Sequence, residues 1–209
     1  MNHWLQLLLE QIRETGWLQW VAVFFGVAEV LLAKRNNVLL YPAGLIGTGL
    51  SIFLLLEAQL YAETLLNVYY VVMSIYGWYF WMRKRNEPPV PITYTTKKEW
   101  IITAFITFGG WLVLYLILKN YTPSNVPVWD AFVSSTAWAG TWLLTRRKIE
   151  NWLVLNLSNL FAVPLLFYKN LPMFALLTLF LFVVAIFGYF DWRKIYRNAP
   201  QTSYPAPNL

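Results

Sequence analysis

The residues with the clearest capacity to hold a ligand are two asparagines within an apolar segment. Trp152, Asn156 and Asn159 stand at i, i + 4 and i + 7, which places them on one face of a helix. An asparagine amide in hydrocarbon is costly unless it is paired, so this face is expected to point into a bundle of helices. The amides could bind a ligand there or join neighbouring helices, and for Trp152 a place in the aromatic belt is the alternative.

A second group of candidates lies on the apolar segment just before this one. Trp138, Thr141 and Trp142 stand at i, i + 3 and i + 4 and also share a helix face. A pocket of ring faces and amides with no acid suits a flat heterocycle. A delocalised cation would suit it best, because each ring face can contribute roughly 0.5–2 kcal/mol by cation–π attraction.

A polar stripe of Asn67, Tyr70 and Ser74 on a third apolar segment completes the candidate site, with helix packing as the alternative role. Ionisable side chains are nearly absent from the interior of the apolar segments. Glu29 is expected near the end of its segment, close to Lys34. Proton relays need acids or histidines inside the bilayer, so the pattern argues against proton coupling. The chain has no phosphate-cradling glycine loop, which argues against the use of ATP.

These candidates belong to a chain whose composition predicts an all-α integral membrane protein. Of the 209 residues, 58% are hydrophobic and 12% are charged. Seven apolar runs approach the roughly 20 residues that a helix needs to cross a bilayer. They are 17–33, 38–56, 61–82, 99–118, 130–145, 152–167 and 172–191. A single histidine and the lack of cysteine argue against an enzyme, and no metal site or cofactor is expected.

The distribution of basic residues predicts the orientation in the membrane. With seven spans, thirteen of the sixteen fall on one side, namely Lys34, Arg35, Arg83, Lys84, Arg85, Lys97, Lys98, Arg146, Arg147, Lys148, Arg193, Lys194 and Arg197. The positive-inside rule makes that side cytoplasmic, with the N-terminus outside. The net charge of +6 is thereby explained without a nucleic-acid partner. An amphipathic pre-helix over 1–16 is expected to lie on the membrane surface.

The chain also repeats itself. Residues 17–82 form a first three-helix unit and residues 130–197 a second, joined by a cytoplasmic linker and one connecting helix over 83–129. At a constant offset the matching pairs are Leu65/Leu176, Leu66/Leu177, Val72/Val183, Ile75/Ile186, Gly77/Gly188 and Trp81/Trp192. Three helices plus one return the chain to its starting side, so the repeats are predicted to be parallel, as 3+1+3. The tail over 198–209 is expected to be disordered.

Three stretches resemble the PnuC vitamin transporter family. They are Leu60-Tyr61-Ala62-Glu63 through Asn67-Val68-Tyr69-Tyr70 to Tyr76-Gly77-Trp78 with Trp81, the run from Leu143 to Trp152, and Phe187-Gly188-Tyr189 with Trp192-Arg193-Lys194. The resemblance implies a fold similar to the SWEET sugar carriers and uptake of nicotinamide riboside by facilitated diffusion across the bacterial inner membrane. It also implies trapping by a cytoplasmic kinase, and a trimer.

Two positions depart from the family pattern. Leu155 stands where the family has a second tryptophan, and Thr141 stands where a glutamine is common. Both fall at the expected substrate site. Thiamine, another flat cation that close relatives carry, is therefore the alternative substrate, and a membrane scaffold without transport is the alternative of another class.

Overall fold

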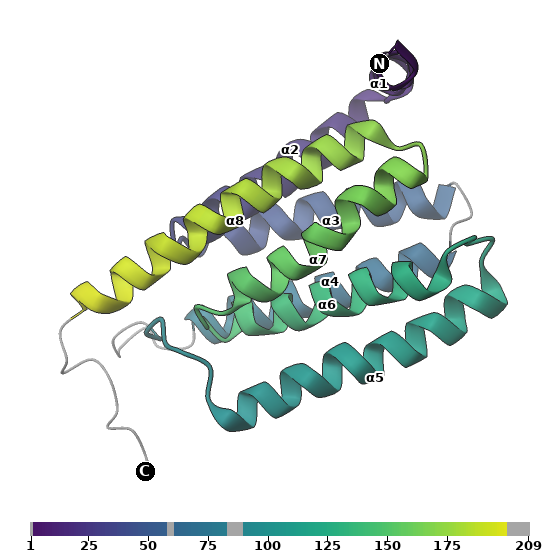
Figure 1. The fold of residues 1–209 in the computed structure, drawn as a ribbon. Coiled ribbons are helices and arrows are strands. Elements are labelled where there is room, and N and C mark those ends of the chain that lie inside the picture. Colours follow the sequence, from purple (N-terminus) through teal and green to yellow (C-terminus); the bar gives the residue numbers. More distant parts are fainter. Residues whose placement is uncertain (1, 58–60, 83–89, 200–209) are drawn as a thin grey trace.

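The computed structural model describes residues 2–57, 61–82 and 90–199, and these residues form eight helices (Figure 1). The helices are α1 (Asn2–Glu14), α2 (Trp17–Lys34), α3 (Leu40–Glu57), α4 (Tyr61–Met82), α5 (Lys97–Tyr121), α6 (Pro127–Thr145), α7 (Asn151–Tyr168) and α8 (Pro172–Asn198). The predicted all-α class is confirmed, and each predicted span falls on one of α2–α8. The predicted tail lies outside the described residues from position 200 onward.

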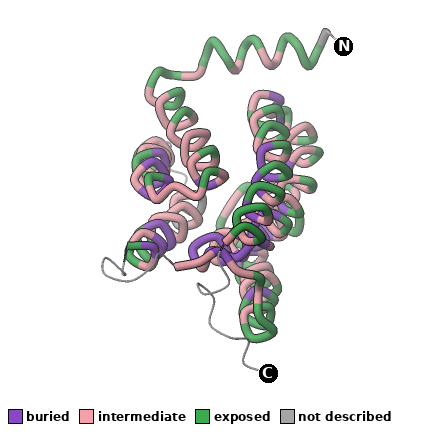
Figure 2. The backbone as a smooth tube through the Cα atoms, turned by 90° about the vertical axis from the view of Figure 1, so that its left-hand side faces the viewer, coloured by how far each residue is buried: buried purple, intermediate pink, exposed green. Residues whose placement is uncertain are grey.

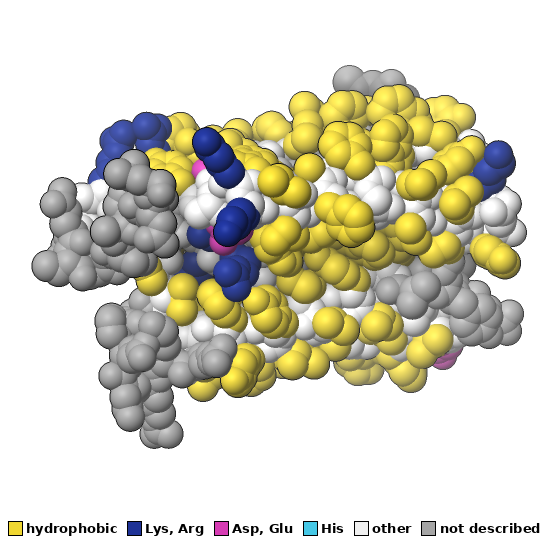
Figure 3. All heavy atoms as spheres, turned by 90° about the horizontal axis from the view of Figure 1, so that it is seen from below, with side chains coloured by type: hydrophobic (Ala, Val, Ile, Leu, Met, Phe, Trp, Pro, Cys, Tyr) yellow, Lys and Arg dark blue, Asp and Glu magenta, His cyan; other side chains and the backbone are white. Residues whose placement is uncertain are grey.

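The surface of the helices is that of a multi-pass membrane protein. Five of the described helices, α2, α3, α5, α7 and α8, are long and apolar enough to cross a membrane. Apolar side chains cover most of the face in Figure 3, and on α5 the ring of Phe105 is 76% exposed. Because such a surface would be unfavourable in water, it is expected to contact lipid. The two other long helices, α4 and α6, run alongside the five (Figure 1).

Six of the long helices close into a ring. Each packs against the next along the chain in the series α2, α3, α4, and again in the series α6, α7, α8. Contacts of α4 with α6 and of α2 with α8 then join the two series. Helix α5 lies outside the ring, mainly against α6, at the lower edge of Figure 1. The ring therefore has an interior that side chains of all six helices can reach.

Helix ends follow local sequence signals. The hydroxyl of Thr96 accepts a hydrogen bond from the Glu99 N–H, and the Glu99 carboxylate accepts one from the Thr96 N–H, which forms a capping box at the start of α5. Shortly after the ends of α2, α6 and α7 the chain passes through a residue in the left-handed conformation, with φ of 53° at Asn36, 56° at Arg147 and 57° at Asn170. Asparagine adopts this conformation readily, whereas arginine does so at a cost that its contacts must offset.

Most basic side chains lie at one end of the ring, the end that holds the α2–α3 and α6–α7 turns. Figure 3 shows several of these dark blue side chains gathered toward its left side. We call this the basic end. The opposite end holds α1 and the α7–α8 turn. Helix α1 is seen end-on in Figure 1 and side-on in Figure 2, so it runs across the direction of the other helices.

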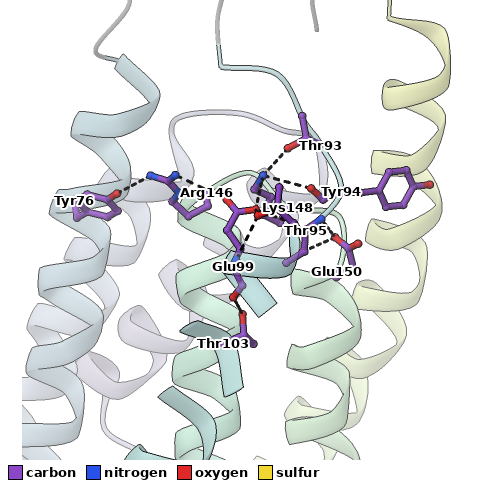
Figure 4. Close-up of polar contacts among 10 residues, drawn as sticks. Tyr76, Thr93, Tyr94, Thr95, Glu99, Thr103, Arg146, Lys148 and Glu150 are labelled. Atoms are coloured by element: carbon purple, nitrogen blue, oxygen red, sulfur yellow. Dashed lines mark hydrogen bonds and ion pairs between the residues drawn. The ribbon is translucent and has the colours of Figure 1, made fainter. Parts of the chain in front are cut away.

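The segment that precedes α5 is tied to the α6–α7 turn at the basic end (Figure 4). Thr93 forms a short parallel bridge with Lys148, and the Lys148 ammonium lies 2.9 Å from a Glu99 carboxylate oxygen. The Glu150 carboxylate accepts hydrogen bonds from the N–H and hydroxyl of Thr95, at 2.9 and 2.7 Å. The described part of the predicted linker is therefore docked on the second helical unit.

Candidate functional site

A cavity of about 880 Å³ occupies the interior of the ring. All six ring helices contribute to its wall, and its size is within the range typical of small-molecule sites. Its polar lining includes the amides of Gln19 and Asn67 and the hydroxyls of Thr48, Ser51, Tyr70, Ser74 and Thr141. Apolar side chains of α3, α7 and α8 form the rest. Such a wall can hold a ligand with an apolar ring and several hydrogen-bonding groups.

Four of the eight residues proposed from sequence line this cavity. Asn67 and Tyr70 reach it from α4, Thr141 from α6 and Trp152 from the first turn of α7. The structure thus brings together residues of both helical units. Leu155 also lines the cavity, so the two positions that depart from the family pattern both face it.

The other four, Trp138, Trp142, Asn156 and Asn159, are not among the described residues of the cavity wall. The Trp138 ring stacks on Tyr69 at 4.5 Å between centroids and packs beside α5. The Asn159 amide lies 3.5 Å from the Asn156 side-chain oxygen. A role of these four residues in substrate binding stays a prediction.

Glu29 overturns the expectation of a pocket without an acid. It lines the cavity from α2, and its carboxylate lies against the backbone of Gly44 on α3. Lys34, which was expected to lie close to Glu29, pairs instead with Asp191 at 3.5 Å. The reason is helical geometry, because five residues along a helix rotate a side chain by about 140° around the axis. The two side chains therefore point in different directions.

The face of α2 that meets the cavity carried a signal in the sequence. Gln19, Ala22, Gly26, Glu29 and Ala33 recur at alternating intervals of three and four residues, and all five line the cavity. This spacing marks one helix face that is small or polar within an apolar helix. Within the described residues, no three His, Asp or Glu side chains gather to hold a metal ion.

Two matching aromatic pairs pack toward the basic end, where Trp152 belongs to the cavity wall. Tyr41 packs edge-on against Trp81 with ring centroids 5.2 Å apart, and Trp152 packs edge-on against Trp192 at 5.7 Å. Tyr41 lies on Gly77, and Trp152 lies on Gly188. Tyr41 therefore occupies the place on Gly77 that Trp152 occupies on Gly188, and the two glycines are one of the matching pairs of the repeat.

The two tryptophans of these pairs also cross between the helical units. The Trp81 N–H donates to the Thr145 carbonyl at 3.1 Å, and the Trp192 N–H donates to the Ala33 carbonyl at 2.9 Å. Both bonds are buried, where an unmade hydrogen bond would be costly. The aromatic cluster of Tyr41, Trp81, Trp152 and Trp192 thus holds the basic end of the ring closed.

Arg147 completes this closed end. Its guanidinium lies 3.9 Å from the centre of the Trp81 ring and donates hydrogen bonds to the Asn36 side chain and the Val90 carbonyl. Burial lowers the pKa of Arg147 to about 10, and the nearby Tyr41 partly opposes that shift. The side chain remains charged at neutral pH. These contacts also hold its left-handed backbone conformation in place.

At the opposite end, the cavity wall includes residues of α1 and of the first turn of α8. Gln11, Glu14 and Thr15 belong to the wall. The Gln11 side chain donates to the Asn170 carbonyl at 2.7 Å and accepts from the Met173 N–H at 3.2 Å, which anchors α1 to the α7–α8 turn. The cavity wall therefore runs from Trp152, near the basic end, to α1 and the first turn of α8 at the opposite end.

Comparison with known proteins identifies the family. A family model described as nicotinamide mononucleotide transporter matches residues 16–194. The nicotinamide riboside transporter PnuC of Escherichia coli (strain K12) is 24% identical over 205 residues, covering 86% of each chain, and the protein of the same name from Shigella flexneri gives the same values. The crystal structure of the vitamin B3 transporter PnuC matches with a TM-score of 0.71 and 21% identity, covering 94% of this chain and 91% of that one, which establishes the fold. The chain belongs to the nicotinamide mononucleotide transporter family, of the PnuC type that the sequence resemblance predicted.

Proposed function

We propose that this protein takes up nicotinamide riboside across the bacterial inner membrane by facilitated diffusion. The observation that carries the proposal is the cavity inside the ring, whose wall joins amides and hydroxyls to the rings of Tyr70 and Trp152. Hydroxyls and amides can pair with the ribose and the carboxamide, and ring faces can contact the flat pyridinium. A riboside transporter is also what the curated relatives are named.

The charges of the wall favour the riboside over the mononucleotide. No Lys, Arg or His is found among the described residues that line the cavity. A phosphate group brought into such a site would lose its hydration without gaining a cationic partner, which is unfavourable. The riboside lacks the phosphate and needs no such partner. A cytoplasmic kinase would then trap the substrate by adding a phosphate that the cavity cannot accommodate.

We propose further that α2–α8 all cross the membrane as 3+1+3 parallel repeats of the SWEET type. The matching pairs Tyr41/Trp81 and Trp152/Trp192 support this arrangement. The units then comprise residues 17–82 and 130–197, and the basic end is cytoplasmic with the N-terminus outside. In that orientation the cavity is open toward the outside and closed toward the cytoplasm. Assembly into a trimer is part of the proposal.

Binding to the purified protein tests the substrate. In calorimetry, nicotinamide riboside is expected to bind, and the mononucleotide is expected to bind more weakly or not at all. Thiamine is the second candidate, because Thr141 and Leu155 both face the cavity. Tight binding of thiamine alone would reassign the substrate, and binding of none of the three would favour a scaffold. Saturable uptake into liposomes without ATP or an ion gradient tests the mechanism.

Asn67→Ala is expected to weaken nicotinamide riboside binding about tenfold, because a hydrogen bond to a neutral group in a water-poor site contributes about 0.5–1.5 kcal/mol. Asn120→Ala, at the exposed end of α5, is the matched control and should bind as the unaltered protein does. Calorimetry gives the affinities, and thermal unfolding in detergent shows that each variant is folded. Equal affinity in the two variants would remove Asn67 from the site.

Asn159→Ala tests the four predicted residues outside the described cavity wall. If Asn159 contacts substrate in another conformation of the carrier, the variant loses binding while it remains folded. Unchanged affinity would assign the Asn156–Asn159 contact to helix packing.

A further inference from the structure

We infer that Glu29 determines charge selectivity, so that the cavity accepts organic cations and discriminates against neutral analogues of the same shape. The inference rests on the proposed function, because it concerns the same cavity. It assigns to α2 the recognition of positive charge, which the uncharged site residues on α4, α6 and α7 do not provide.

The position of the carboxylate is the first support. Glu29 lines the cavity from α2, as Tyr70 does from α4. Gly44 leaves room for it, since a Cβ atom at Gly44 would lie 2.5 Å from a Glu29 carboxylate oxygen. The glycine therefore seats the carboxylate between α2 and α3 on the cavity wall.

The second support is the missing counter-charge. Within the described residues, no Lys, Arg or His makes an ion pair with Glu29, and none lines the cavity. An acid inside a membrane helix is costly and is normally compensated by a partner. A cationic substrate would supply that partner when it enters. A neutral substrate would leave the carboxylate uncompensated, and an anionic one would be repelled.

Two forms of one molecule separate charge from shape. Nicotinamide riboside carries a positive pyridinium ring, whereas its reduced dihydropyridine form is uncharged and has nearly the same size. The unaltered protein should therefore prefer the oxidised form. Glu29→Gln retains the shape of the side chain and removes its charge, so this preference should disappear.

Calorimetry on purified full-length protein in detergent tests the inference with both forms of the riboside. Glu29→Gln is expected to bind the oxidised form about 30-fold more weakly, as for loss of one partner of a buried charge pair. Its affinity for the reduced form should stay the same or rise. Glu57→Gln, an acid at the exposed end of α3, is the matched control and should retain the preference.

A second pair of variants leaves Glu29 in place. Gly44→Ala must displace the carboxylate, whereas Gly49→Ala on the same helix meets no atom within 4 Å. Only Gly44→Ala should reduce the preference for the oxidised over the reduced form of the riboside. If Glu29→Gln and Gly44→Ala both keep the preference of the unaltered protein, the inference is overturned and the proposed function stands. If the unaltered protein binds neither form, the proposed function fails and the inference fails with it.

Discussion

Trp192→Ala is expected to lower the free energy of unfolding by about 3–5 kcal/mol, the range found when a buried large aromatic side chain is truncated. Trp192 has no exposed surface, and its ring contacts Trp152 and Trp81 at centroid distances of 5.7 and 6.3 Å. Its N–H also joins α8 to α2 through the Ala33 carbonyl. The substitution therefore removes packing and a buried hydrogen bond at once. Thermal unfolding in detergent, without ligand, measures the loss.

Two variants separate these contributions. Trp192→Phe retains an aromatic ring but leaves the Ala33 carbonyl without its donor, so a smaller loss of about 1–3 kcal/mol is expected. Trp17→Ala removes an indole that is 77% exposed and should change stability little. If Trp192→Ala unfolds at the same temperature as Trp17→Ala, the aromatic cluster does not hold the basic end closed.

The positions of the helices could be predicted from the sequence because bilayer crossing imposes a length and a composition on each segment. The predicted span 61–82 has the same bounds as α4. The largest difference is at α8, which continues to Asn198 rather than ending at 191. Its last turns are polar and extend beyond the apolar run, so the apolar pattern could not reveal them.

The register of the repeat was harder to predict. In the sequence, Tyr41 and Trp152 differ in type, and their match emerges only because each packs on an equivalent glycine. At the turns that precede α3 and α7, Asn36 and Arg147 are both left-handed, and they stand at the same offset in the sequence as Gly77 and Gly188. The two helical units share backbone geometry at positions where their side chains differ, and a comparison of residue types alone does not detect it.

The candidate site was predictable only in part. Spacing correctly groups residues on a helix face, but it does not say which neighbour that face meets. Thr141 and Trp138 lie one turn apart on α6, yet Thr141 meets the cavity and Trp138 stacks on Tyr69. Glu29 was misplaced for the same reason. How each helix is rotated about its axis depends on packing against all of its neighbours, which single-segment patterns do not contain.

The glycine beneath Trp152 provides a test that links stability to binding. A Cβ atom at Gly188 would lie 2.7 Å from one carbon of the Trp152 indole and 2.8 Å from two others. Trp152 is 1% exposed and packs edge-on against Trp192, so its rigid ring has little room to retreat. Gly188→Ala is therefore expected to lower the free energy of unfolding by about 1–3 kcal/mol, as overpacking does, despite the better helix propensity of alanine.

Binding should be lost in the same variant, because the ring of Trp152 forms part of the cavity wall and would be pushed toward the ligand. Gly109→Ala on α5 is the matched control, since its Cβ would meet Phe105 only at an ordinary contact distance of 3.9 Å. It should bind nicotinamide riboside normally and be at least as stable as the unaltered protein. Calorimetry and thermal unfolding on both variants decide the matter. A Gly188→Ala protein that binds normally would show that the Trp152 ring can move without consequence, and its place in the proposed site would have to be abandoned.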